Sequence, residues 1–190
     1  MNSTTASHPT APHPAAPHAT FDSDRLVRAD EKLQRKILAT IRKKSFCILA
    51  TTSPAARSHS AGVIYEYVQG QLWIHSLRNS RKARSIAKNS HVGVTIPFRR
   101  LPAGPPFTIH FQATAEIVDM DSPRVLSLLE SGRLSAIAGH GALQMTEGCF
   151  LVLEPVGSVH SYGLGARVID LIRDPLNNGF AMFDLDEVER

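Results

Sequence analysis

The chain has 190 residues, of which 43% are hydrophobic, and it carries a net charge of +4. This length suits one domain of ordinary size with a tail, and the hydrophobic fraction is sufficient for a packed core. No stretch approaches the ~20 consecutive apolar residues that a transmembrane helix requires, and the polar N-terminus lacks the apolar segment of a secretory signal, so we expect a cytoplasmic protein with no membrane partner.

The N-terminal residues 1–20 are rich in Pro, Ala, Thr and His. Such a segment buries too little apolar surface to offset its ordering entropy, which predicts a disordered tail. A helix is expected over about residues 25–43, because the Asp-Ser-Asp segment 22–24 can cap it and apolar residues recur at helical spacing. Its many Lys and Arg residues are typical of a solvated face.

The next part of the chain alternates between strands and one short helix. The expected elements are strands over 45–52 and 58–68, a Gln69-Gly70 turn, a strand over 72–76, a helix over 80–88 and a strand over 92–96. Trp73 is expected in the core or at a subunit interface. Cys47 and Cys149 lie in apolar segments, which is typical of small buried side chains rather than of a disulfide or a metal pair.

Residues 97–106 are rich in Pro, which indicates a stiff loop. The elements expected after it are an alternating strand over 107–117, a helix over 122–132 that Ser122 caps, a short helical piece over 133–138, strands over 149–154 and 157–161 that Pro155 separates, and a possible strand within 163–173. Residues 174–190 are acidic and are expected to form a C-terminal tail.

Strands outnumber helices and most connections are short. The economical arrangement is a mainly β, α+β domain, an antiparallel barrel with helices on its outside, which we expect over residues 21–173. Positive charge gathers in residues 25–44 and 78–100, which predicts an anionic ligand, either a phosphorylated cofactor or nucleic acid. Nucleic acid is the weaker hypothesis, because the strands lack the interleaved exposed aromatics that stack bases.

The sequence carries no motif for hydrolysis, dinucleotide binding or a P-loop. The histidines show no H-x-x-x-H spacing and there is no C-x-x-C pair, so no metal site is predicted, although distant histidines can converge in a fold. The candidate ligand site is Ser80-Arg81-Lys82. It combines a hydroxyl and two cations at the start of the expected helix, where free N–H groups also favour an anion.

This part of the chain resembles the pyridoxamine 5'-phosphate oxidase-like family of FMN-binding split β-barrels. The resemblance covers about residues 41–162. The residues that carry it are His75-Ser76, Ser80-Arg81-Lys82, Lys88-Asn89-Ser90 and Val92-Gly93-Val94. It implies a six-stranded antiparallel split barrel and a homodimer with FMN between the subunits. The implied activity is a flavin-dependent oxidation or reduction of a small organic molecule.

The resemblance also implies roles for individual residues. Arg81 and Lys82 would hold the FMN phosphate, with Ser80, His75 and Ser76 beside the phosphate and the ribityl chain. The strand residues Ser60, Ala61, Gly62 and Val63 would run along the flavin ring, and Thr108 would lie near the ring or the ribityl chain. The catalytic residues are not assigned.

The chain departs from the vitamin B6 oxidases of that family. Those enzymes place an Arg where Ser60 stands and a Lys where Tyr65 stands, and they carry a C-terminal Arg-x-His segment that this chain lacks. We therefore expect that pyridoxine phosphate is not the substrate, and that Tyr65 and Trp73 form a flatter, less charged pocket wall. The alternatives are a deazaflavin cofactor, or a haem-binding or haem-degrading split barrel with His110, His140 or His160 at its pocket.

Overall fold

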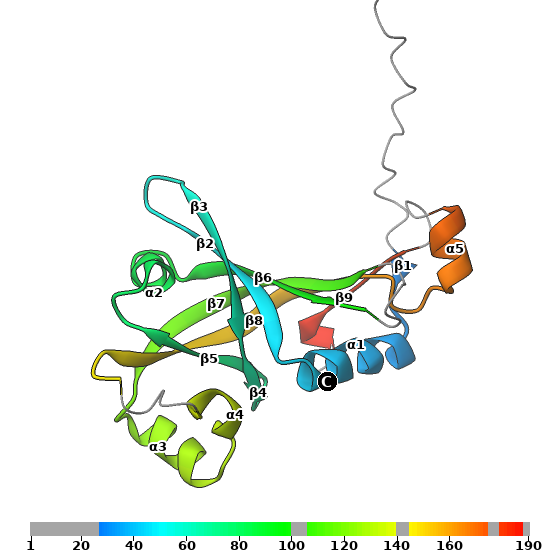
Figure 1. Ribbon diagram of the computed structural model, residues 1–190. Coiled ribbons are helices and arrows are strands. Elements are labelled where there is room, and N and C mark those ends of the chain that lie inside the picture. Colours follow the sequence, from blue (N-terminus) through cyan, green and yellow to red (C-terminus); the bar gives the residue numbers. More distant parts are fainter. Residues whose placement is uncertain (1–26, 100–105, 140–144, 175–178, 188–190) are drawn as a thin grey trace, which may run out of the picture.

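The computed structural model describes residues 27–99, 106–139, 145–174 and 179–187 (Figure 1). The expected tail over residues 1–20 and the candidate haem ligand His140 lie outside these residues. No helix in the described ranges is both long enough and apolar enough to cross a membrane.

The architecture is mostly β with helices on its flanks, as the sequence predicts. The strands are β1 (Val27–Arg28), β2 (Phe46–Thr52), β3 (Ser58–Ile64), β4 (Glu66–Val68), β5 (Gln71–Leu77), β6 (His91–Phe98), β7 (Phe107–Asp119), β8 (Gly148–Tyr162) and β9 (Phe180–Asp184). They form one open sheet in the order β1-β9-β8-β7-β6-β2-β3, and β5 pairs with β4 and with β8. The expectation of six strands is too low, since the described residues contain nine.

The helices are α1 (Glu31–Lys43), α2 (Arg81–Ile86), α3 (Pro123–Glu130), α4 (Ser135–Ala138), α5 (Val168–Arg173) and a 3-10 turn, η3 (Leu185–Glu187). In Figure 1, α3 and α4 lie on one side of β5 and α2 lies on the other, while α5 lies beside β1. The first helix begins later than expected, because Asp30 accepts a hydrogen bond from the backbone N–H of Leu33 and so provides the cap. The cap predicted at Ser122 is confirmed.

Two predictions about the C-terminal part are wrong. The possible strand within residues 163–173 is a helix, α5, over its second half. Within the acidic segment 174–190, which was expected to be a tail, β9 pairs antiparallel with β8 and parallel with β1. Ala181 and Phe183 of β9 are buried, and this burial holds the segment in the sheet despite its charge.

Two prolines that were expected to interrupt strands lie inside them. Pro155 does not split β8, because β8 pairs with β5 up to Leu153 and with β9 only from Ser158 onward. Pro97 extends β6 beyond Thr95, the last residue of β6 that pairs with β2. Each proline therefore lies where one edge of its strand has no neighbour, and its missing N–H costs no ladder hydrogen bond.

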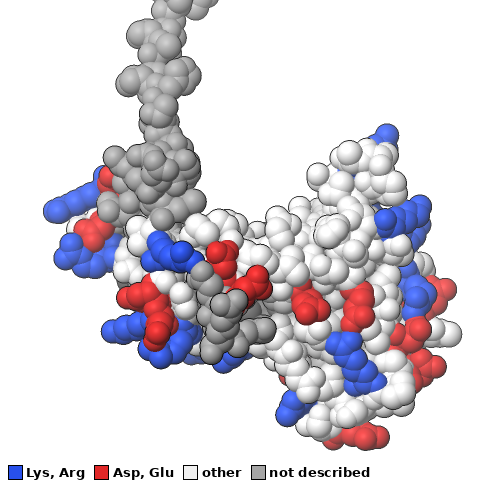
Figure 2. Space-filling view, turned by 180° about the vertical axis from the view of Figure 1, so that it is seen from behind, with Lys and Arg blue, Asp and Glu red and all other residues white. Residues whose placement is uncertain are grey.

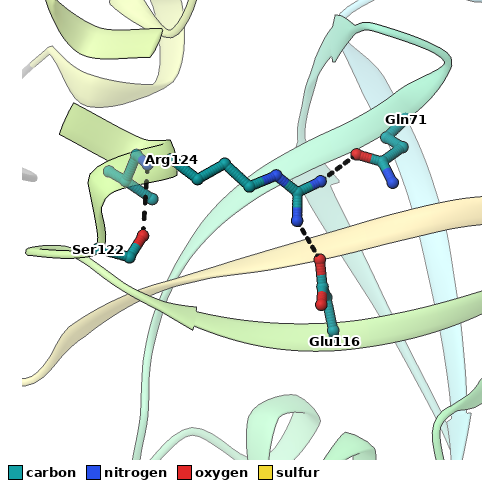
Figure 3. Close-up of polar contacts among 5 residues, drawn as sticks. Gln71, Glu116, Ser122 and Arg124 are labelled. Atoms are coloured by element: carbon teal, nitrogen blue, oxygen red, sulfur yellow. Dashed lines mark hydrogen bonds and ion pairs between the residues drawn. The ribbon is translucent and has the colours of Figure 1, made fainter. Parts of the chain in front are cut away.

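The hydrophobic core has two parts. The larger part lies on the inner face of the sheet, where the buried side chains of Ile37 and Ile41 from α1 pack against it. The smaller lies between the outer side of β5 and β8 and the helices α3 and α4, around Trp73 and Phe150. Arg124 closes this second core: its guanidinium lies 4.7 Å from the centroid of the Trp73 ring and bonds to Gln71 and Glu116 (Figure 3).

The junction between β3 and β4 is tied to the first helix. Tyr65 is 1% exposed and its hydroxyl donates a 2.7 Å hydrogen bond to the backbone carbonyl of Ile41. The predicted turn at Gln69-Gly70 joins β4 to β5, and both of its residues have positive φ, 51° and 85°. This geometry is typical of the two-residue hairpin turns that match the twist of the strands.

Candidate functional site

A pocket of 370 Å³ lies where β3, β5, α2 and α4 meet, and we call it the β3–α2 pocket. Its lining residues are Gly62, Val63, Ile64, His75, Lys82, Ala136, Ile137, Gly139 and Met145. Its volume is within the usual range of small-molecule sites, and most of its lining is apolar with a few polar groups. The pocket unites four residues that sequence reasoning assigned to a ligand site: Gly62, Val63, His75 and Lys82.

Helix α2 is positioned by its cap and by its buried side. The hydroxyl of Ser80 accepts a hydrogen bond of 3.3 Å from the backbone N–H of Ala83 and lies 3.0 Å from the hydroxyl of Ser76. Ala83 and Ile86 are buried beneath the helix. This arrangement leaves Arg81 exposed and turns Lys82, which is half-buried, into the pocket.

The positive charge at this site comes from side chains. Helix α2 has only six residues, so its backbone dipole adds little to the charges of Arg81 and Lys82. Neither cation forms an ion pair with an acidic side chain among the described residues, whereas the nearby Arg78 is bonded to Asp119. An anion is therefore the ligand that complements this end of the pocket.

His75 contributes a polar atom without a partner. Its Nε2 atom is buried and makes no hydrogen bond within the described part of the chain. Burial lowers the pKa of His75, and the ammonium of Lys82 lowers it further, so both favour the neutral imidazole. A Cβ atom at Gly148 would lie 3.2 Å from this nitrogen, so the glycine keeps space open beside it.

The far wall of the pocket is formed by Ala136 and Ile137 of α4, with Glu66 behind it. Burial raises the pKa of Glu66, while the nearby backbone N–H groups of Ala136 and Ile137 lower it. The Oε2 atom of Glu66 is buried and has no hydrogen-bond partner among the described residues. The residues from α4 were missed by sequence reasoning, because they meet β3 and β5 only through packing and carry no polar signal of their own.

The other predicted site residues are placed as follows. Ser60 and Ala61 lie further along β3 and do not line the pocket. Ser76 is buried and its hydroxyl faces Ser80. Phe150 of β8 pairs with His75 on one side and with Val118 of β7 on the other, so these three residues form one row across the sheet. Thr108 lies ten residues before Val118 along β7. At ~3.3 Å per residue, Thr108 is separated from His75 by about 33 Å along the sheet of one subunit.

Tyr65 and Trp73 do not form a pocket wall, and this prediction is wrong. Both side chains are buried in the monomer, at 1% and 0% exposure. Tyr65 packs in the larger core and Trp73 in the smaller one. The burial of Cys47 and Cys149 as free thiols is confirmed.

A second hollow of 710 Å³ lies on the outer face of β6, β7 and β8, and we call it the outer-face hollow. His110 and His160, two of the haem candidates, line it together. It shares a face of the sheet with the β3–α2 pocket, because His110 pairs with Thr95, Thr95 with Ile48, and Ile48 with Gly62 of that pocket. On the face shown in Figure 2, Lys and Arg side chains are interspersed with Asp and Glu and form no continuous basic surface.

The open sheet, its flanking helices and the basic pocket at one end define a split β-barrel protein. A sequence profile described as pyridoxamine 5'-phosphate oxidase matches residues 33–144. This match spans more than half of the chain, which therefore belongs to the pyridoxamine 5'-phosphate oxidase family. No curated protein matches the chain.

Solved structures share the fold. The haem storage protein HutZ from Vibrio cholerae is 19% identical, with a TM-score of 0.59 over 70% of this chain and 96% of that chain. A FAD-binding protein from Mesorhizobium loti is 15% identical, with a TM-score of 0.55 over 67% and 90%. A haem-binding protein from Mycobacterium smegmatis is 16% identical, with a TM-score of 0.58 over 75% and 57%. At these identities the similarity establishes the fold alone.

Proposed function

We propose that the protein binds FMN in the β3–α2 pocket and acts as a flavin-dependent oxidoreductase on a small organic molecule. The observation that carries the proposal is the combination of two cations, Arg81 and Lys82, with the Nε2 atom of His75, none of which has an acidic or hydrogen-bonding side-chain partner among the described residues. A phosphate would satisfy the cations, and a polar atom of the ligand would satisfy the imidazole. FMN, when bound, supplies the hydride or electron transfer.

The residues that would hold the cofactor come from three elements. Lys82 and Arg81 would bind the phosphate, with Lys82 contributing more because it is half-buried. The backbone of residues 60–63 would lie along the flavin ring, beside the Phe46 ring, which packs closely against Gly62. Ser80 and Ser76 keep α2 in place through their hydroxyl contact, and the apolar wall from α4 excludes water from the ring.

The proposed substrate carries no phosphate group. A phosphorylated substrate needs well-placed cations in a partly dry pocket. Ser60 is neutral and Tyr65 is buried with its hydroxyl bonded to a backbone carbonyl, so neither position provides one. The Pro-rich segment 97–106 carries two further cations, Arg99 and Arg100. Arg99 is exposed and does not line the pocket, and Arg100 lies outside the described residues.

We further propose a homodimer with the flavin at its interface. The strand β3 is the edge of the sheet, and Phe46, Ile48 and Ile64 on β2 and β3 expose 47%, 37% and 60% of their surface. Phe46 and Ile64 are cross-strand partners and therefore share one face. Ile64 also lines the β3–α2 pocket, so a second subunit that covers this apolar face would also cover the pocket.

Haem is the second candidate ligand for the same pocket. The observation that favours it is again the Nε2 atom of His75, because a neutral imidazole nitrogen without a hydrogen bond can ligate iron. The propionates of haem would use the same cations. Deazaflavin also carries a flat ring and a phosphate, and the residues of the pocket do not distinguish it from FMN.

The test begins with the visible spectrum of the purified protein and chromatography of the compound that heat releases. We expect flavin bands and FMN. The apoprotein is then titrated with FMN, followed by flavin fluorescence and by the melting temperature, which a ligand specific for the native state raises. A Soret band without flavin would favour haem, and unchanged fluorescence and melting temperature would overturn the FMN proposal.

A further inference from the structure

The register of the sheet brings three potential metal ligands into one row on its outer face. His110 of β7 pairs with His160 of β8, and His160 pairs on its other side with Met182 of β9. Directly paired residues of neighbouring strands point to the same face of a sheet. The row is on the outer face, because Ile109 and Phe111 on either side of His110 are buried in the core.

The two imidazoles are already aligned. The ring centroids of His110 and His160 are 5.2 Å apart and the ring planes differ by 6°. Both rings line the outer-face hollow, which includes Gly157 and Ser158 near the irregularity of β8. Rotation of the two side chains about their χ angles would bring one nitrogen of each ring to a shared metal ion. Met182 lies one strand further, next to His160.

The chemistry of this set is selective. Two imidazoles and a thioether are soft or borderline ligands, and the carboxylate of Asp184 on the same face is bonded to Ser158 and paired with Arg28. Copper has the highest affinity of the first-row metals for nitrogen ligands, and a thioether favours its cuprous state. No cluster of three or more His, Cys, Asp or Glu side chains occurs in the described ranges, so this set is distinct from a typical zinc site.

We propose that His110, His160 and Met182 form a copper site on the outer face of the sheet, separate from the β3–α2 pocket. The neutral form of histidine is the metal ligand. The hollow above the row leaves room for a further ligand from solvent or from a small molecule.

The test uses the full chain in which the three tail histidines are replaced, H8Q, H13Q and H18Q, because a histidine-rich segment can bind metal by itself. Cupric ion is added, and the number of histidine ligands is counted by pulsed electron paramagnetic resonance. In this measurement each coordinated imidazole modulates the electron spin echo. Cuprous affinity is measured anaerobically by competition with a chromophoric chelator. The variants are His110→Ala, His160→Ala and Met182→Leu, and His91→Gln is the control because His91 is exposed on β6, outside the row.

We expect one copper per chain with two imidazole ligands. Each histidine variant should lose one imidazole signal and about tenfold or more in affinity, and His91→Gln should match its parent. Met182→Leu should weaken cuprous binding and leave the cupric spectrum almost unchanged. Absence of copper binding by this chain without the tail histidines, or binding that is equal in all variants, would overturn the proposal. The result does not depend on flavin, so its failure and that of the proposed function are distinguishable.

Discussion

Replacing Lys82 tests the assignment of the phosphate most directly. The change Lys82→Met removes the ammonium but keeps the length and the apolar stem of the side chain, so the wall of the β3–α2 pocket is preserved. The matched changes are Arg81→Gln, on the same helix but exposed, and Arg84→Gln, which is exposed and does not line the pocket. All three remove one positive charge.

The exposure of each side chain sets the expected magnitude. Lys82 is half-buried and next to His75, so its bond to a phosphate should be worth ~1.5–3 kcal/mol, which is about 10- to 150-fold in affinity. Arg81 is exposed, and solvent screens its interactions to ~0.2–1 kcal/mol, about 1.5- to 5-fold. Arg84→Gln should leave the affinity unchanged. Lys82→Met should also raise the pKa of His75, because it removes one of the two causes that lower it.

The assay is a fluorescence titration at constant ionic strength with FMN and, in parallel, with riboflavin, which lacks the phosphate. The difference between the two ligands isolates the phosphate contact, as a double-mutant cycle isolates a pairwise interaction. Lys82→Met should weaken FMN binding and spare riboflavin binding. A loss that is equal for both ligands, or an equal effect of Lys82→Met and Arg84→Gln, would refute the reasoning.

Three further predictions address stability, thiol reactivity and substrate. Tyr65→Phe leaves the carbonyl of Ile41 without its donor and should lower the free energy of unfolding by ~1–3 kcal/mol, a drop of a few degrees in Tm by calorimetry, while Tyr162→Phe serves as the control. Burial raises the pKa of Cys47 to about 12, so iodoacetamide at pH 8 should label this thiol only after unfolding; rapid labelling of the native protein would contradict its burial. The FMN-loaded protein should not oxidise pyridoxine phosphate, and turnover near ~1 per second or faster would restore that activity.

Local signals were sufficient for part of the fold. The helix start at Ser80, the Ser122 cap and the hairpin turn at Gln69-Gly70 depend on residues within one turn of each other, and all three are confirmed. The placement of β9 depends instead on pairing with β8, a contact between distant segments that an acidic composition conceals. Pro155 was expected to separate two strands for a similar reason. Only the pairing of β8 with β5 and β9 shows that no neighbouring strand faces the backbone nitrogen of this proline.

The candidate site divides in the same way. His75 and Lys82 are close in the sequence, and a strand followed by a capped helix was enough to bring them together. The α4 wall and the row of His110 and His160 arise from segments that meet only in the folded sheet. Their residues carry no spacing pattern, so sequence analysis could name the histidines as candidates but not as neighbours.

The long strand β8 has a consequence for the dynamics of the protein. Its first half pairs with β5 and its second half with β9, while β7 accompanies it along most of its fifteen residues. Opening β8 therefore requires breaking three pairings at once, so its amides should exchange with deuterium only through the rarest openings. The short edge strands β1 and β4 should exchange far sooner. One end of β8 lies next to His75 of the β3–α2 pocket, and the other end contains His160 of the outer-face hollow. A ligand bound at either site should therefore slow amide exchange in β8.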